Sequence, residues 1–166
     1  TFNNSCYRVK MANIAQTVNV LQAMVLTNQN ELIKTPTFYV FKMYKVHFDA
    51  LMLPTEVHAE AFGEGDYNFP SLSVSASKNS KNEINITVAN ITSDRDLSTQ
   101  IELDGLINYK IEKAEIITSD KINDFNDFGK EGEVNISNFE GVEENENYLA
   151  LDLPSKSVTL ITLQKK

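Results

Sequence analysis

Short runs of alternating apolar and polar residues fill the chain from Ser71 to its C-terminus, and this period of two most restricts the fold. "SLSVSAS" (71–77) and "EINITVANI" (83–91) show the alternation most regularly. Turn-rich clusters such as "SKNSKN" and "TSDRD" separate the further runs at 98–105, 109–118, 132–137, 147–153 and 156–164. Such runs are typical of antiparallel strands that turn one face to solvent and one to a core. We therefore predict seven or eight antiparallel strands in a β-sandwich or barrel.

Residues 1–50 follow a different pattern. In "NIAQTVNVLQAMV" (13–25), the apolar residues Ile14, Val18, Leu21 and Val25 recur at helical spacing. Many of the apolar residues there are β-branched, which favours a strand, so the pattern leaves helix and strand open. A dense apolar segment this close to Thr1 leads us to expect that the chain begins inside a larger protein.

The segment "TPTFYVFKMYKVH" (35–47) predicts a helix. Thr35 can cap its first turn, and Pro36 suits the first helical position, where a missing N–H group costs nothing. His47 falls near the end of this helix and suits its negative pole, so we expect a structural role for it rather than a catalytic one.

Composition restricts the partners of the chain. Its 166 residues are 42% hydrophobic, which favours one globular domain, or one domain with part of another. The net charge of −8 and the scattered basic residues argue against nucleic acid as a partner. No apolar run approaches the ~20 residues that cross a bilayer, so we expect no membrane partner. We expect the single cysteine, Cys6, to be a small buried apolar residue.

Two acidic clusters are candidates for metal or acid–base chemistry. Asp120, Asp124 and Asp127 lie close together in "SDKINDFNDF" (119–128), but the glycine and distal glutamate of a calcium-binding loop are missing. Because Asp and Asn often cap turns, we favour a structural role there. We interpret the second cluster, with Glu143, Glu144 and Glu146, as a solvated hairpin tip.

Other chemistry-bearing patterns are absent from the sequence. His47 and His58 have no partners at metal-ligand spacing, and there is no G-x-S-x-G motif, phosphate loop or CxxC pair. We therefore predict no catalytic residue, no metal site and no cofactor in this chain.

Two blocks near the N-terminus carry a resemblance to a known family. "VKMANIAQTVNVLQAMVLT" followed by "TPTFYVFKMYKVH" resembles the end of the catalytic barrel of family 51 glycoside hydrolases, the α-L-arabinofuranosidases. "AEIITSDKINDFNDF" is similar to a strand and Asn-x-Phe loop of that family's accessory sandwich, and "LDLPSKSVTLITL" is similar to its last strand. The matching blocks extend over nearly the whole chain.

The resemblance implies a (β/α)8 barrel followed by a β-sandwich. The expected fold is therefore mainly β, with an antiparallel sandwich at 50–166 preceded by the end of the barrel at 1–49. Residues 8–16 would form the last barrel strand, and 36–47 the last barrel helix. Active sites of such barrels lie at the C-terminal ends of their strands. A glutamine there contacts the arabinofuranosyl ring in the family, and it matches Gln16; Asn13 and Asn19 belong to the same motif without an assigned contact.

The resemblance also implies a retaining hydrolase that removes terminal arabinofuranosyl residues from arabinan- or arabinoxylan-type polysaccharides. Its two catalytic glutamates lie on earlier barrel strands, and no position of this chain matches either motif. We therefore expect the isolated chain to be inactive, with its catalytic partners upstream and its localisation unassigned. The apolar faces of 9–25 and 38–48 would lack their barrel neighbours, so we expect them to pack on the sandwich, to pair with a second chain as a homo-oligomer, or to be poorly ordered.

Two further hypotheses concern the sandwich itself. It could be a carbohydrate-binding module, although the absence of tryptophan weakens that interpretation. Its candidate stacking residues, for which core packing is the alternative we favour, are Tyr67, Phe69, Phe125, Phe128 and Phe139. It could also be a purely structural domain that braces the barrel, which is the interpretation we favour for 50–166.

Overall fold

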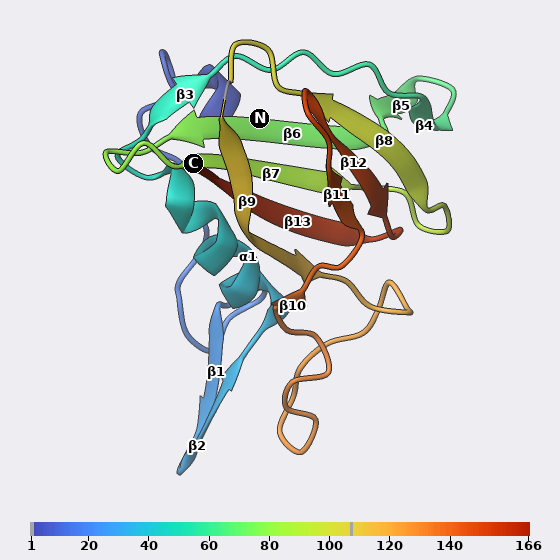
Figure 1. The fold of residues 1–166 in the computed structure, drawn as a ribbon. Coiled ribbons are helices and arrows are strands. Elements are labelled where there is room, and N and C mark those ends of the chain that lie inside the picture. The colour runs from blue at the N-terminus through green and yellow to red at the C-terminus, as the bar shows by residue number, and fades with distance from the viewer. Residues whose placement is uncertain (1, 107) are drawn as a thin grey trace.

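A computed structural model describes residues 2–106 and 108–166 and contains two facing antiparallel sheets (Figure 1). The larger sheet has the strand order β10-β9-β13-β7-β6-β3, and the smaller one has the order β11-β12-β8. The six strands of the larger sheet are β3 (Leu51–Leu53), β6 (Leu72–Lys78), β7 (Ile84–Asn90), β9 (Tyr109–Ile117), β10 (Ser137–Asn138) and β13 (Ser157–Lys165). The smaller sheet consists of β8 (Leu97–Glu102), β11 (Val142–Glu144) and β12 (Tyr148–Leu153). The predicted antiparallel β-sandwich is confirmed.

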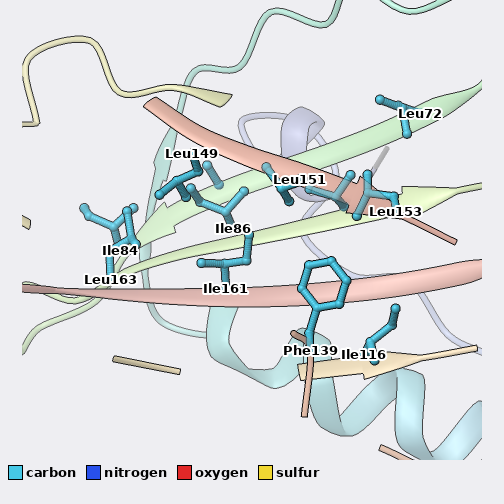
Figure 2. Packing of buried hydrophobic residues seen from close by; sticks show 12 residues of the cluster. Leu72, Ile84, Ile86, Ile116, Phe139, Leu149, Leu151, Leu153, Ile161 and Leu163 are labelled. Carbon is cyan, nitrogen blue, oxygen red and sulfur yellow. The ribbon is translucent and has the colours of Figure 1, made fainter. Parts of the chain in front are cut away.

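Alternating apolar residues from both sheets form the main core between them (Figure 2). Ile84 and Ile86 of β7 and Ile161 of β13 meet leucines of β12, and all of these side chains are at most 4% exposed. Each such aliphatic side chain contributes roughly 1.5–3 kcal/mol by leaving water. The period of two in the sequence therefore predicts the core-facing positions of β6, β7 and β12 correctly.

The opposite face of the larger sheet is polar, yet it is also buried. We expected polar positions of the strands to face solvent, but Ser77, Asn85 and Thr87 are at most 3% exposed. A helix, α1 (Pro36–Tyr44), and the short 3-10 helix η2 (Lys45–His47) lie against this side of the sheet (Figure 1). Met43 of α1 packs there with Ile117 and Leu160 in a second apolar cluster. The alternation in the sequence predicts that the hydroxyl-rich strand faces are exposed to solvent. It cannot predict that a helix covers one of these faces.

The predicted helix at 36–47 is confirmed as α1 continued by η2. Two predicted strands are not formed in the described chain. Residues 8–16 form no strand, since a lone barrel strand needs parallel neighbours to satisfy its backbone groups, and no barrel arrangement is visible in the described residues. Within 132–137, only Ser137 belongs to a strand, because the side chain of Asn126 occupies both backbone polar groups of Val134.

Three smaller elements lie outside the two sheets. The 3-10 helix η1 (Asn3–Ser5) opens the described chain. A hairpin of β1 (Val25–Asn28) and β2 (Glu31–Lys34) extends from the start of α1 away from the sandwich (Figure 1). A second hairpin pairs β4 (Ala61–Glu64) with β5 (Tyr67–Pro70). No helix in the described ranges is long and apolar enough to span a bilayer.

The N-terminal segment leaves large apolar side chains in solvent. Six of them, which we call the N-terminal apolar tract, are exposed by 41–88%: Phe2, Tyr7, Met11, Ile14, Val18 and Leu21. Cys6 lies in the same segment and is exposed, so the expectation that it is buried is wrong. Cys6 and the six residues of the tract are exposed for the same reason, because no other described part of the chain covers their side chains. Of the two apolar regions expected to lose their neighbours, 38–48 packs on the sandwich through Met43, whereas most of 9–25 is exposed.

Candidate functional site

The candidate substrate-contacting residue, Gln16, lies in an exposed segment outside the helices and strands. All residues from 10 to 19 are exposed, and the backbone of 10–16 forms no hydrogen bond to another described residue. The amide of Gln16 can both donate and accept hydrogen bonds, which suits recognition of neighbouring hydroxyl groups on a sugar. The position is therefore open to a ligand or to a covering domain.

A tightly bonded loop follows Gln16 directly. The carbonyl oxygen of Thr17 accepts hydrogen bonds from the backbone N–H groups of Met24 (3.0 Å) and Val25 (3.1 Å). Asn19 donates its own backbone N–H to the carbonyl of Val25 (3.1 Å), and Val18 forms a parallel bridge with Val25. Residues 17–19 are thereby fixed on the first residue of β1, so Gln16 is attached to an ordered support on one side.

Thr35 joins this loop to α1. Its side-chain oxygen accepts from the backbone N–H of Phe38 (3.5 Å) as the predicted helix cap, and it donates to the carbonyl of Ala23 (2.7 Å). The first turn of the helix and the end of the loop are therefore held by one hydroxyl group.

His47 anchors the other end of this region to the large sheet. Its Nδ1 lies 2.7 Å from Oγ of Ser77 on β6, and its Nε2 lies 3.0 Å from Oγ1 of Thr87 on β7. Burial lowers the pKa of His47 from its ordinary 6.5 to about 4, so the ring is neutral at pH 7. The ring of Tyr44 packs against it, and burial raises the pKa of that tyrosine. The structural role expected for His47 agrees with these contacts.

The acidic cluster at 119–128 caps turns. The carboxylate of Asp124 accepts from the hydroxyl of Ser119 and from the backbone N–H of Lys121, and these bonds lower its pKa. Asp127 accepts from the N–H of Phe128 at 2.8 Å. Among the described residues, no group of three or more His, Cys, Asp or Glu side chains is placed to hold a metal ion.

Asn126 is the residue of this loop with the most connections. It is 2% exposed, and its amide nitrogen donates to the carbonyls of Lys34 (2.8 Å) and Val134 (2.7 Å), while its oxygen accepts from the N–H of Val134 (2.8 Å). These bonds tie the β1–β2 hairpin to the loop that follows β9. Its position in an Asn-rich turn gave no indication of this long-range contact.

Glu144 corrects part of the expectation for the second acidic cluster. Rather than being only a solvated tip, it accepts from the backbone N–H of Ile111 (2.9 Å) and pairs with the ammonium of Lys166 (3.0 Å). Both contacts lower its pKa. Glu143 and Glu146 are exposed, as expected.

The five candidate stacking residues differ in burial, and Phe128 is half-buried. Phe139 is 8% exposed and belongs to the main core, whereas Tyr67, Phe69 and Phe125 are more than half exposed. The core packing that we favoured for all of them is therefore wrong for these three.

Comparison with known proteins agrees with this architecture. A family model described as the alpha-L-arabinofuranosidase C-terminal domain matches residues 1–157. A curated relative, the intracellular exo-alpha-L-arabinofuranosidase of Bacteroides ovatus, is 42% identical over 98% of this chain and 32% of its own length. The solved family 51 arabinofuranosidase of Xanthomonas axonopodis pv. citri is 31% identical, with a TM-score of 0.93 over 98% of this chain and 33% of that one. That of Bifidobacterium longum has a TM-score of 0.89 at 19% identity, over 98% of this chain and 32% of that one, which supports the fold alone.

The sandwich and its N-terminal extension thus define a C-terminal accessory domain of the type found in glycoside hydrolases. The chain belongs to the alpha-L-arabinofuranosidase C-terminal domain family, which confirms the resemblance to family 51. It spans about a third of the length of the curated relative that it matches.

Proposed function

We propose that this chain acts as the C-terminal part of a retaining α-L-arabinofuranosidase. The whole protein would remove terminal arabinofuranosyl residues from arabinan- or arabinoxylan-type polysaccharides. The observation that carries the proposal is the exposure of Gln16 and of the N-terminal apolar tract together, in a chain 42% identical to an enzyme named as an exo-acting arabinofuranosidase.

The apolar tract is the part of the proposal that concerns packing. Side chains such as Met11 and Leu21, 78% and 88% exposed, each gain roughly 1.5–3 kcal/mol when an apolar surface covers them. We assign that surface to a preceding catalytic (β/α)8 barrel, with 1–49 as the barrel's edge and 50–166 as the accessory sandwich. In this arrangement the segment 8–16 gains the parallel neighbours that a barrel strand requires.

Gln16 is the part of the proposal that concerns chemistry. At the C-terminal end of a barrel strand, its amide would bind hydroxyl groups of the arabinofuranosyl ring and orient the anomeric carbon. Retaining hydrolysis then requires an acid/base and a nucleophilic carboxylate about 5–5.5 Å apart. Both would come from the preceding barrel, so the isolated chain would hold one edge of the site and none of its catalytic groups.

Activity measurements on an aryl α-L-arabinofuranoside test this division of labour. We expect turnover by the full-length protein, and only background hydrolysis by residues 1–166 alone. Turnover by the isolated chain above that of a heat-denatured sample would refute the division. Failure of the full-length protein to cleave arabinofuranosides would refute the proposed activity.

A second candidate function rests on the β4–β5 hairpin. Tyr67 and Phe69 lie two residues apart on β5 and share a face, with exposures of 78% and 57%. Exposed rings in this arrangement can stack on sugar faces. If the hairpin binds polysaccharide, Tyr67→Ala and Phe69→Ala will weaken retention of the chain on arabinan or arabinoxylan, and Phe48→Ala, on another exposed ring, will not.

A further inference from the structure

We infer that Asn19 is a positioning residue for Gln16, acting through a two-way hydrogen bond to Thr27. The inference rests on the proposed contact of Gln16 with substrate. It concerns a residue that the sequence pattern singles out but to which that function assigns no role.

The oxygen and the nitrogen of the Asn19 side-chain amide both form hydrogen bonds to Thr27. Its Oδ1 accepts the backbone N–H of Thr27 at 2.7 Å, and its Nδ2 donates to Oγ1 of the same residue at 3.0 Å. Thr27 belongs to β1, eight positions further along the chain. A paired contact of this kind fixes the orientation as well as the distance of the bonded group.

The backbone at Asn19 has a conformation that few residues tolerate. Its φ angle is +56°, in the left-handed region, where asparagine is favoured over most other side chains. Asn19 therefore combines a left-handed backbone conformation, three residues after Gln16, with the side-chain bonds that hold this loop on β1.

The connection to Gln16 is short. Only Thr17 and Val18 separate the two residues, and both are bonded or bridged to the start of β1. On the other side of Gln16, residues 10–15 form no backbone hydrogen bond to a described residue. Within the described chain, the direction of Gln16 is therefore set from the Asn19 side.

The support itself is connected to the sandwich by hydrogen bonds. β1 pairs with β2 over four residue pairs, and the carbonyl of Lys34 at the end of β2 accepts from the buried amide of Asn126. A hydrogen-bonded route thus runs from Asn19 to Thr27, through the hairpin, to the loop that follows β9. Through it the accessory sandwich sets where the substrate-contacting residue lies.

A double-mutant cycle in the full-length protein tests the inference. The variants are Gln16→Ala, Asn19→Gly and their combination; glycine keeps the positive φ while removing only the side-chain bonds. We expect Asn19→Gly to lower kcat/KM by about 10- to 100-fold, because a displacement of about 1 Å at a contacting group has this effect. The loss should divide between kcat and KM as it does in Gln16→Ala.

The combined variant separates positioning from general stability. If Asn19 acts through Gln16, adding Asn19→Gly to Gln16→Ala will change kcat/KM by less than about 2-fold. Asn19→Asp should retain most of the activity, because one oxygen still accepts from Thr27 N and the other can accept the Thr27 hydroxyl proton. As a matched control, Asn28→Ala removes an exposed asparagine–Glu31 bond from the same hairpin and should leave kcat/KM unchanged.

The outcomes distinguish the two levels of the proposal. A Gln16→Ala protein with full activity would overturn the substrate contact, and the positioning role with it. If Gln16→Ala is impaired but Asn19→Gly is fully active, the positioning role alone is overturned. The same holds if the losses of kcat/KM in the two single variants multiply in the double variant.

Discussion

At the scale of single residues, His47 shows how two hydroxyl groups on a buried sheet face are paired. The neutral ring can accept from one hydroxyl and donate to the other, so it satisfies Ser77 and Thr87 at once. Protonation would place a positive charge in this largely buried site, where water solvates it poorly. This is why burial lowers the pKa of His47.

The same shift predicts how stability depends on pH. The pKa of His47 is about 4 in the folded chain and near 6.5 when unfolded. Between these values the unfolded state binds up to about one more proton, so the free energy of unfolding decreases as pH falls through this window and is unaffected above it. Urea unfolding at a series of pH values should show a shallower pH slope for His47→Gln than for the parent chain. Equal slopes in the two proteins would contradict this origin.

For two fully buried threonines, Thr159 and Thr87, we predict that replacement by valine changes the free energy of unfolding in opposite directions. Thr159 lies between Val88 and Ile116 on the core side of the sheet, and its hydroxyl has no hydrogen-bond partner among the described residues. Thr159→Val should therefore raise the free energy of unfolding by about 1 kcal/mol. Thr87→Val, which removes a bond to His47, should lower it by about 1–3 kcal/mol. Chemical denaturation measures both, and the same sign for the two variants would be inconsistent with these assignments.

At the scale of elements, Asn126 connects parts of the fold that are far apart in sequence. Its three hydrogen bonds join the β1–β2 hairpin to the segment before β10. Asn126→Ala leaves three backbone groups without this partner, and we expect a loss of about 2–4 kcal/mol of stability. Amide exchange should accelerate in both connected segments. The control is Asn135→Ala, at an exposed asparagine bonded only to Gly132, which should change stability by less than about 0.5 kcal/mol.

The elements also show what the sequence alone could predict. The core strands and α1 follow from alternation and from the Thr35–Pro36 start, because these signals are local. The burial of Thr87 and the loop at 132–137 depend on partners distant in sequence, His47 and Asn126, so no local pattern reveals them. Gln16 could be singled out only through the family motif, since an exposed glutamine has no distinguishing pattern of its own.

At the scale of the whole molecule, the N-terminal apolar tract governs how the isolated chain behaves. Large exposed apolar side chains promote association, so we expect concentration-dependent self-association of residues 1–166 in light scattering. Replacing Met11 and Leu21 by glutamate should reduce it, whereas replacing Tyr67, on the β4–β5 hairpin, should not. Association unaffected by the Met11 and Leu21 replacements would assign the contact to another surface.

The central claim is that this chain docks through its N-terminal tract on a catalytic barrel and delivers Gln16 to the sugar. A crystal structure of the full-length protein with bound arabinose tests it most directly. We predict that the tract is buried against the barrel and that the Gln16 amide lies about 3 Å from a hydroxyl of the furanose ring. A tract still open to solvent, or a Gln16 side chain turned away from the bound sugar, would contradict the claim.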